Sequence, residues 1–142
     1  MKDKAKVLYV QSQYDVFACE QFAKMFRKPH HIICFHAQQA AEKRLKSLIL
    51  LNGIKDKGFE THDIGHLLHL LDGRYELSQK FWDKSDIMTN FATKTRYEDV
   101  ESYTDNESNM AVAYAKEICS WVDDKISAMD GQLLKDLTIE IK

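Results

Sequence analysis

Residues 34–48 read Cys-Phe-His-Ala-Gln-Gln-Ala-Ala-Glu-Lys-Arg-Leu-Lys-Ser-Leu, and this stretch decides the fold class. On a helical wheel its small and apolar residues gather on one face, opposite its polar residues. The first set is Ala37, Ala40, Ala41, Leu48 and Leu51, and the second is Gln39, Glu42, Lys43 and Lys46. Further on, Leu45, Ile49 and Leu50 extend the apolar surface almost all the way round. Helices that are apolar on most sides are buried, so we expect a central helix over residues 30–52.

Helical spacing continues on both sides of this segment. Residues 4–27 predict an amphipathic helix with apolar positions at Val7, Val10, Tyr14, Phe17, Cys19, Phe22 and Met25. Pro29 separates it from the central helix, which a proline can open at no cost in hydrogen bonds. Further helices are expected over residues 62–72 and 76–91, and from a capping box at Thr104 and Glu107 to Gly131. Residues 92–106 lack periodicity and predict a long loop, and such loops are often functional.

The length and composition indicate one all-α domain. A chain of 142 residues with one Pro and five Gly has room for a single core and favours long helices. Short connections imply antiparallel neighbours, so we expect an antiparallel up-and-down bundle of four to five helices over residues 1–131. Residues 132–142 are expected to form a frayed C-terminal tail. Alternating Leu137, Ile139 and Ile141 leave pairing with a partner's strand edge as the alternative.

The overall charge and the cysteines limit the class of protein. A net charge of −2 does not favour a nucleic-acid coat or an anionic membrane surface. Cys19, Cys34 and Cys119 are odd in number and widely spaced, which is typical of reduced thiols in the cytoplasm. We see no signal peptide and no apolar run of about 20 residues, so no contact with a membrane is expected. No cofactor is expected either.

Three histidines are weak candidates for a metal site. His62, His66 and His69 share one face of the predicted third helix, a spacing that can hold a transition metal. Ile64, Leu67, Leu68 and Leu71 lie on the opposite face, so the histidines are expected to point to water. We therefore predict no metal.

Two other positions allow a structural and a functional interpretation. Thr61 or Asp63 can cap the third helix, or His62 and Asp63 can line a polar cleft. Arg44 lies inside the apolar stripe of the central helix, where an unpaired guanidinium is very costly. It is expected to reach water at the edge of the stripe, form a structural ion pair, or bind an anionic ligand or an acidic patch on a second subunit.

The predicted long loop contains the strongest candidates for ligand binding. Arg96 can bind a phosphate through two parallel hydrogen bonds. Tyr97 and Tyr103 can stack on a nucleobase.

Three segments together resemble the HEPN domain family. They are residues 37–46, Thr61-His62-Asp63 and Thr95-Arg96-Tyr97, and the resemblance spans about residues 5–129. It implies an up-and-down helical bundle, usually a homodimer, and frequent partnership with a separate minimal nucleotidyltransferase as a toxin–antitoxin pair. It also implies nucleotide binding or, in some members, metal-independent RNA cleavage.

The resemblance assigns cleavage to an arginine that is followed after four to six residues by histidine. Arg96 fits the arginine, but the chain's six histidines all precede it, and Glu101 stands where an Arg-x4-His pattern has histidine. Tyr103 stands where members with Arg-x4-His-x-Tyr have the tyrosine that a nucleotidyltransferase modifies with AMP. Losing one acid–base group costs about 10²–10⁴ in rate, and an ionised Glu101 serves poorly as an acid.

We therefore predict a non-catalytic HEPN-type module that binds a nucleotide or a partner protein. Its expected contacts are Arg96, Tyr97, Tyr103, His62, Asp63 and Arg44. One alternative is a degenerate ribonuclease toxin that uses Arg96, with Glu101 as a second catalytic candidate. Another is a structural subunit of a nucleotidyltransferase complex.

Overall fold

The computed structural model describes residues 2–97 and 103–141, with only the backbone for residues 57 and 92–97. The described part is helical, with no strand among its elements: α1 (Lys2–Phe22), α2 (His30–Leu51), a short 3₁₀ turn η1 (Lys57–Phe59), α3 (Ile64–Leu71), α4 (Gln79–Tyr97), α5 (Asp105–Met129) and α6 (Gly131–Leu137). The predicted all-α class is confirmed.

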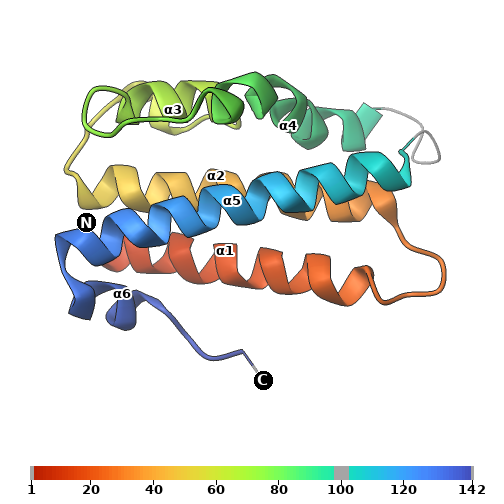
Figure 1. Cartoon of the computed structure of the whole chain (residues 1–142), viewed down its shortest axis with the longest axis horizontal. Helices are drawn as coiled ribbons and strands as arrows, with labels where there is room; N and C mark the ends of the chain where they lie inside the picture. The colour runs from red at the N-terminus through yellow and green to blue at the C-terminus, as the bar shows by residue number, and fades with distance from the viewer. Residues whose placement is uncertain (1, 98–102, 142) are drawn as a thin grey trace.

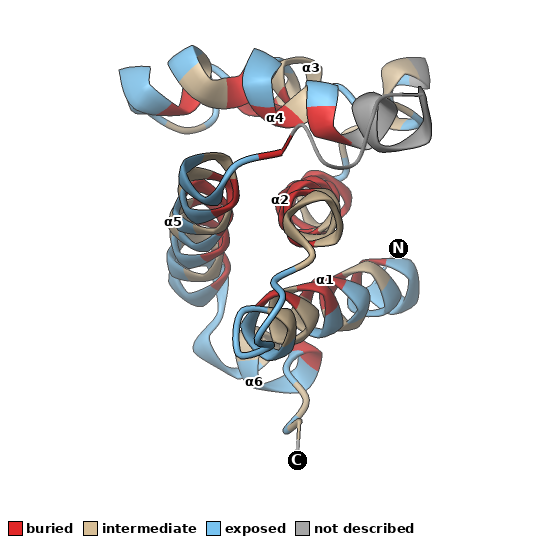
Figure 2. Ribbon diagram, turned by 90° about the vertical axis from the view of Figure 1, so that its right-hand side faces the viewer, coloured by how far each residue is buried: buried red, intermediate tan, exposed pale blue. Residues whose placement is uncertain are grey.

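The long helices form an up-and-down bundle with α2 at its centre (Figure 1). Seen along the bundle, α1, α5 and the α3–α4 layer surround α2 on three sides (Figure 2). Residues on several faces of α2 are therefore buried, from Ala37 and Ala41 to Leu45 and Leu48, all with no exposed area. The prediction of a central, buried helix is confirmed.

Small side chains and hydrogen bonds join α1 to α2, and this differs from the sequence expectation. The inward face of α1 carries Ala5, Tyr9, Ser12 and Cys19, whereas Val7 and Tyr14 are about half exposed. Ser12 Oγ donates to the carbonyl of Ala40 at 2.7 Å, and Ser47 Oγ of α2 donates to the carbonyl of Ala5 at 2.7 Å. The apolar periodicity was therefore right for Cys19 and wrong for Val7 and Tyr14, because α1 approaches α2 largely through small and polar residues.

The helix ends follow the expected chemistry. The Thr104 hydroxyl accepts from the backbone of Glu107, whose side chain accepts from the backbone of Thr104, so the predicted capping box begins α5. Asp63 caps α3 by accepting from the backbone of His66 at 3.2 Å. Gly53 follows α2 with φ 69°, a left-handed conformation that ends many helices and favours glycine.

Two segments differ from their predicted boundaries. The expected loop over residues 92–106 is helical up to Tyr97, because α4 continues for six residues beyond Phe91. Residues 132–137, expected in a frayed tail, belong to α6, whose Leu137 is fully buried. The tail beyond α6 is held by Gln13, whose amide donates to the carbonyl of Ile139 and accepts from its N–H, both at 3.0 Å.

A buried ion pair connects α1, α2 and α5. Arg44 is 4% exposed, and its Nη1 donates to both carboxylate oxygens of Asp123 at 2.9 and 3.1 Å. Its Nε donates to Ser12 Oγ at 3.1 Å, and its guanidinium lies 4.1 Å from the centre of the Tyr9 ring. Tyr9 also donates to Asp123 at 2.8 Å. Of the expected alternatives for Arg44, the structure shows the structural ion pair.

The ionisation of this cluster follows from its surroundings. Burial raises the pKa of Tyr9 to about 12, so Tyr9 stays a neutral donor. Burial opposes the charge of Arg44, but its neighbours, the Asp123 carboxylate among them, raise its pKa, so the guanidinium stays charged. Removing the carboxylate would leave that charge buried without its counter-ion.

We expect Asp123→Ala to lower the free energy of unfolding by about 2–4 kcal/mol, since breaking a largely buried pair is strongly destabilising. Chemical denaturation measures the change. Asp124→Ala is the matched control. Asp124 is the next residue in α5 and is exposed, so its substitution should change the free energy of unfolding by no more than about 0.5 kcal/mol. Equal effects of the two substitutions would show that the ion pair does not stabilise the bundle.

Candidate functional site

Three helix ends meet at the end of the bundle where α4 finishes and α5 begins. Tyr103, just before α5, is 5% exposed. Its ring centre lies 6.0 Å from that of Phe91 in α4 and 6.3 Å from that of His31, at the start of α2. Residues far apart in the chain therefore lie together here, and two of them are aromatic groups next to an imidazole.

His30 adds a second imidazole to this end. Its Nδ1 lies 2.9 Å from Ser108 Oγ, and its Nε2 lies 3.8 Å from Asp105 Oδ1. Ser108 Oγ donates its proton to the carbonyl of Asp105 at 3.1 Å, so Nδ1–H of His30 is the donor to Ser108. This assigns the proton of the neutral ring to Nδ1 and leaves Nε2 as the acceptor.

The predicted ligand-binding residues after Phe91 lie in and beyond the end of α4. Arg96 and Tyr97 are the last two residues of that helix. Arg96 follows Phe91 by five residues, about 7.5 Å along the helix axis. Glu101 lies outside the described residues. Tyr103, expected to stack on a base, has its ring in the hydrophobic core, where it packs against Phe91.

His62 contacts the middle of α2. Its Nδ1 lies 2.8 Å from Oε1 of Glu42, a carboxylate that is 5% exposed, whereas His62 is 63% exposed. Lys46 Nζ donates to the other oxygen of Glu42 at 3.2 Å. Gln38 donates to Glu42 Oε1 at 3.1 Å and to the carbonyl of His62 at 3.2 Å. These contacts attach the start of α3 to α2, and Asp63 serves as the helix cap described above.

The structure does not gather all predicted residues into one compact site. His62 contacts Glu42, which lies eleven residues after His31 in α2, about 16 Å along the helix axis. His62 is therefore remote from His31. The N–H of Ile64 donates to Thr89 Oγ1 at 3.0 Å, which places the start of α3 beside α4, about 10 Å along the axis before Arg96. Arg44 lies elsewhere, between α1 and α5.

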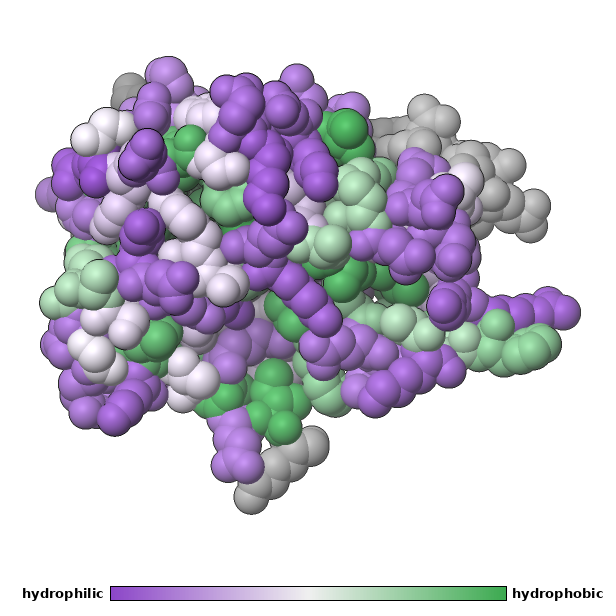
Figure 3. Space-filling model, in the orientation of Figure 1, coloured by the Kyte–Doolittle hydropathy of each residue, from purple (hydrophilic) through white to green (hydrophobic). Residues whose placement is uncertain are grey.

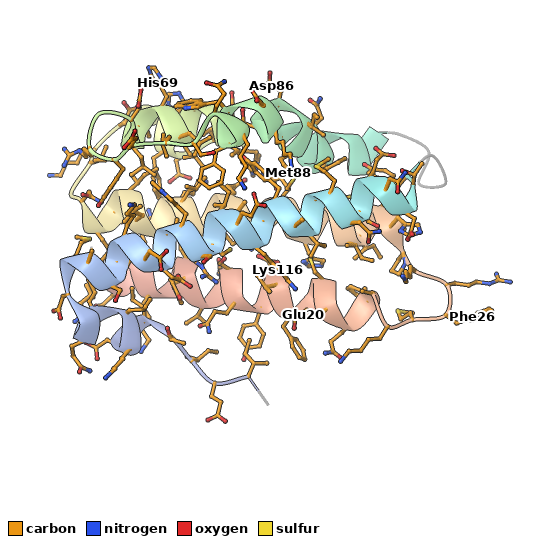
Figure 4. The ribbon with its side chains drawn as sticks, viewed as in Figure 1. Glu20, Phe26, His69, Asp86, Met88 and Lys116 are labelled. Atoms are coloured by element: carbon orange, nitrogen blue, oxygen red, sulfur yellow. The ribbon has the colours of Figure 1, made fainter. Side chains whose placement is uncertain are left out.

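The histidine row of α3 does not form a metal site within the described residues. Groups of three or more His, Cys, Asp or Glu placed to hold an ion are absent there. His69 points outward from the α3–α4 layer (Figure 4), and its ring lies 6.4 Å from that of Trp82. His66 turns instead towards η1 and packs so closely on Gly58 that a Cβ at that glycine would collide with the ring. The sequence prediction of surface histidines is therefore right for His62 and His69, and His66 is half-buried.

The cysteines have structural positions. All three are buried. Burial raises the pKa of the Cys19 thiol to about 12, and burial also raises the pKa of the Cys119 thiol. Both are therefore neutral thiols, as expected of core residues.

Sequence reasoning did not identify His30 and His31 as members of this end of the molecule. Both follow Pro29 and begin α2, and the capping box placed Asp105 and Ser108 at the start of α5. In an up-and-down bundle the start of the second helix and the start of the last helix lie at the same end. The predicted up-and-down topology therefore already implied that His30 and His31 lie near the start of the last helix.

Comparisons with known proteins agree with this architecture. The HEPN domain family matches residues 6–125. The crystal structure of TT1696 from Thermus thermophilus is similar, with a TM-score of 0.75 and 25% identity over 86% of this chain and 98% of that chain. That of ST0689, an archaeal HEPN homologue, has a TM-score of 0.68 and 23% identity over 85% of this chain and 96% of that chain, and shows the shared fold.

A search of the curated proteins found no significant match. Within the described residues, no helix is long and apolar enough to cross a membrane. The family match extends over most of the chain and covers α2, α3, α4 and nearly all of α5. The chain therefore belongs to the HEPN domain family.

Proposed function

We propose that this protein is a non-catalytic HEPN-type module that binds a nucleotide or a partner protein at the end of the bundle where α4 finishes. The observation that carries this proposal is the convergence of His31, Tyr103 and the end of α4, which holds Arg96. Arg96 would contact a phosphate through its guanidinium, and Tyr97 would stack on the base. Family membership supports a nucleotide-related role for this end.

His62 and Asp63 would form the second part of the ligand-binding surface. The start of α3 lies beside α4, about 10 Å along the axis before Arg96. An extended ligand such as a nucleotide could contact both parts. The exposed Nε2 side of His62 would then meet the ligand, since Nδ1 faces Glu42.

The biological setting that we propose is a homodimer in the cytoplasm, paired with a minimal nucleotidyltransferase as a toxin–antitoxin system. Exposed Val7 and Tyr14 on α1 offer an apolar face for a second chain. Tyr103 is the proposed acceptor of AMP from the partner enzyme. Because its ring is buried, that transfer would require the Tyr103 side chain to leave the core.

The nucleotide proposal predicts a stabilisation that depends on Arg96. ATP or GTP should raise the melting temperature of the wild type in a thermal-shift assay, because a ligand that binds the folded state stabilises it. Arg96→Ala should abolish at least about nine-tenths of the affinity, as expected for a charge-assisted phosphate contact of about 1.5–3 kcal/mol. Arg74→Ala, an exposed arginine between α3 and α4, is the matched control and should keep the shift.

Two results would contradict nucleotide binding at this end. One is the absence of a shift with ATP, GTP, cyclic nucleotides and dinucleotides. The other is a shift that survives in Arg96→Ala. Partner binding would then be the remaining part of the proposal, and co-purification with a minimal nucleotidyltransferase encoded next to this protein would test it.

A degenerate ribonuclease is a second candidate, and one observation favours it. The chain lacks a histidine after Arg96, but the fold brings His31 against Tyr103. An imidazole from α2 thus lies beside Tyr103, which follows by two residues the position at which the family pattern has histidine. The carboxylate of Asp105 lies beside the neighbouring His30.

We expect the wild type to leave RNA intact, since Glu101 replaces the required acid–base group. Incubation of RNA with wild type, Arg96→Ala and His31→Ala measures this. His69→Ala is the control, because His69 lies on the outer surface of α3. Cleavage by the wild type that falls about 10²-fold or more in both Arg96→Ala and His31→Ala would replace our proposal with the ribonuclease.

A further inference from the structure

A groove lies between α1, α5 and the C-terminal tail, away from the end that carries Arg96. Its volume is ≈ 560 Å³, within the range of about 300–1,000 Å³ that small-molecule sites occupy. Phe17 of α1 and Ile139 and Ile141 of the tail provide apolar surface, and Arg44 lies at its floor. Figure 3 shows hydrophobic side chains gathered where the tail leaves the body of the molecule.

The tail forms a fixed wall of this groove. Gln13 makes two hydrogen bonds to the backbone of Ile139, and Leu137 is fully buried just before it. Lys2 Nζ, at the start of α1, lies 3.4 Å from Asp136 of α6. The family match ends at residue 125, so this wall lies outside the part of the chain that the family shares.

The floor of the groove contains a buried cation with unused hydrogen-bond donors. Arg44 uses Nε for Ser12 and Nη1 for Asp123 and Tyr9. Its other terminal nitrogen, Nη2, has no hydrogen-bond partner among the residues that the structure describes. Nη2 is not among the fully buried side-chain atoms that lack a partner, so its N–H groups are open to solvent. Because Arg44 lines the groove, an acceptor can reach Nη2 from it.

The remaining charges restrict the ligand to one negative charge. Lys116 lines the groove and lies 3.6 Å from Glu20 (Figure 4), and both are about half exposed. Such an exposed pair contributes little, so Lys116 can turn to a ligand at small cost. Asp123 and Glu20 also line the groove and would repel a dianion. A carboxylate fits this arrangement better than a phosphate.

We propose that this groove binds a small organic acid whose single carboxylate meets Arg44 Nη2 and Lys116 and whose apolar body lies against Phe17, Ile139 and Ile141. The planar guanidinium matches the geometry of a carboxylate. The apolar wall contributes affinity in proportion to the area that the ligand buries. This site is independent of the nucleotide proposal, because it shares no residue with the end that carries Arg96.

Isoleucine methyl spectra of the full chain test the site directly, with octanoate as the probe. Octanoate should shift the methyl signals of Ile139 and Ile141 with saturation and leave those of Ile64 and Ile87 in α3 and α4 unchanged. The uncharged match, 1-octanol, should bind at least about tenfold more weakly, since it lacks the charge-assisted hydrogen bonds. Inorganic phosphate should produce no saturable shift.

Substitutions separate the carboxylate contact from simple apolar adsorption. Lys116→Gln should weaken octanoate binding about fivefold, and Lys24→Gln, an exposed lysine beyond α1, should leave it unchanged. Arg44→Lys keeps the charge but removes Nη2, and should weaken binding about tenfold or more. If the Arg44→Lys variant does not fold, Lys116→Gln and the comparison with 1-octanol still test the carboxylate contact.

Three outcomes would overturn the proposal. They are shifts that grow linearly without saturation, equal affinity for octanoate and 1-octanol, and saturable shifts confined to isoleucines outside the groove. A nucleotide shift that depends on Arg96 would be unaffected by any of them.

Discussion

The guanidinium of Arg44 is the group that the packing of three helices depends on. It lies in the interior, where an isolated charge is very costly, and the surrounding helices each supply part of what it needs. Asp123 comes from α5, and Tyr9 and Ser12 come from α1. The positions of these two helices against α2 are therefore fixed by hydrogen-bond geometry as well as by contact between apolar side chains. Such a network specifies one arrangement more narrowly than apolar packing alone.

The same constraint applies along the whole of α2. A helix that is covered on three sides must find internal partners for each polar side chain that it carries. Glu42 is satisfied by Gln38, Lys46 and His62, and Ser47 is satisfied by the carbonyl of Ala5. These contacts attach α1 and the start of α3 to the central helix. Imidazole, phenol and carboxylate groups lie together at the starts of α2 and α5 instead.

Much of the fold could be predicted because α2 is strongly patterned and the helix ends have clear signals. The capping box at Thr104, the cap at Asp63 and the glycine after α2 are local features, and local chemistry decides them. Arg44 could be recognised as a charge within an apolar stripe, because that pattern is also local. Asp123 was not identified as its partner, although it interrupts the apolar side of α5 next to Cys119 and Ile126 in the same way. Two complementary anomalies on different helices indicate a contact, so a signal for this pair was present in the sequence.

The errors arose where packing does not follow hydrophobicity. The inward face of α1 carries Ala5 and Ser12 because the backbones of α1 and α2 approach closely, and larger residues such as Val7 and Tyr14 then face outward. Residues 92–97 have little apolar periodicity, and α6 is short, with its three leucines within only seven residues. For the proposed nucleotide site, Arg96 and Tyr97 were found from their chemistry. His30 and His31 required knowledge of which helix ends meet.

The contact between Lys2 and Asp136 places the start of α1 beside α6, and the tail beyond α6 then runs along α1 to Gln13. A linker that returns along α1 from Gln13 to Lys2, eleven residues or about 16 Å, could join the tail to α1, and the exposed turn around Phe26 could supply new ends, because domains tolerate circular permutation at exposed turns. In such a permutant the tail would become an internal segment joined to α1, and the wall that it forms would be tied at both ends.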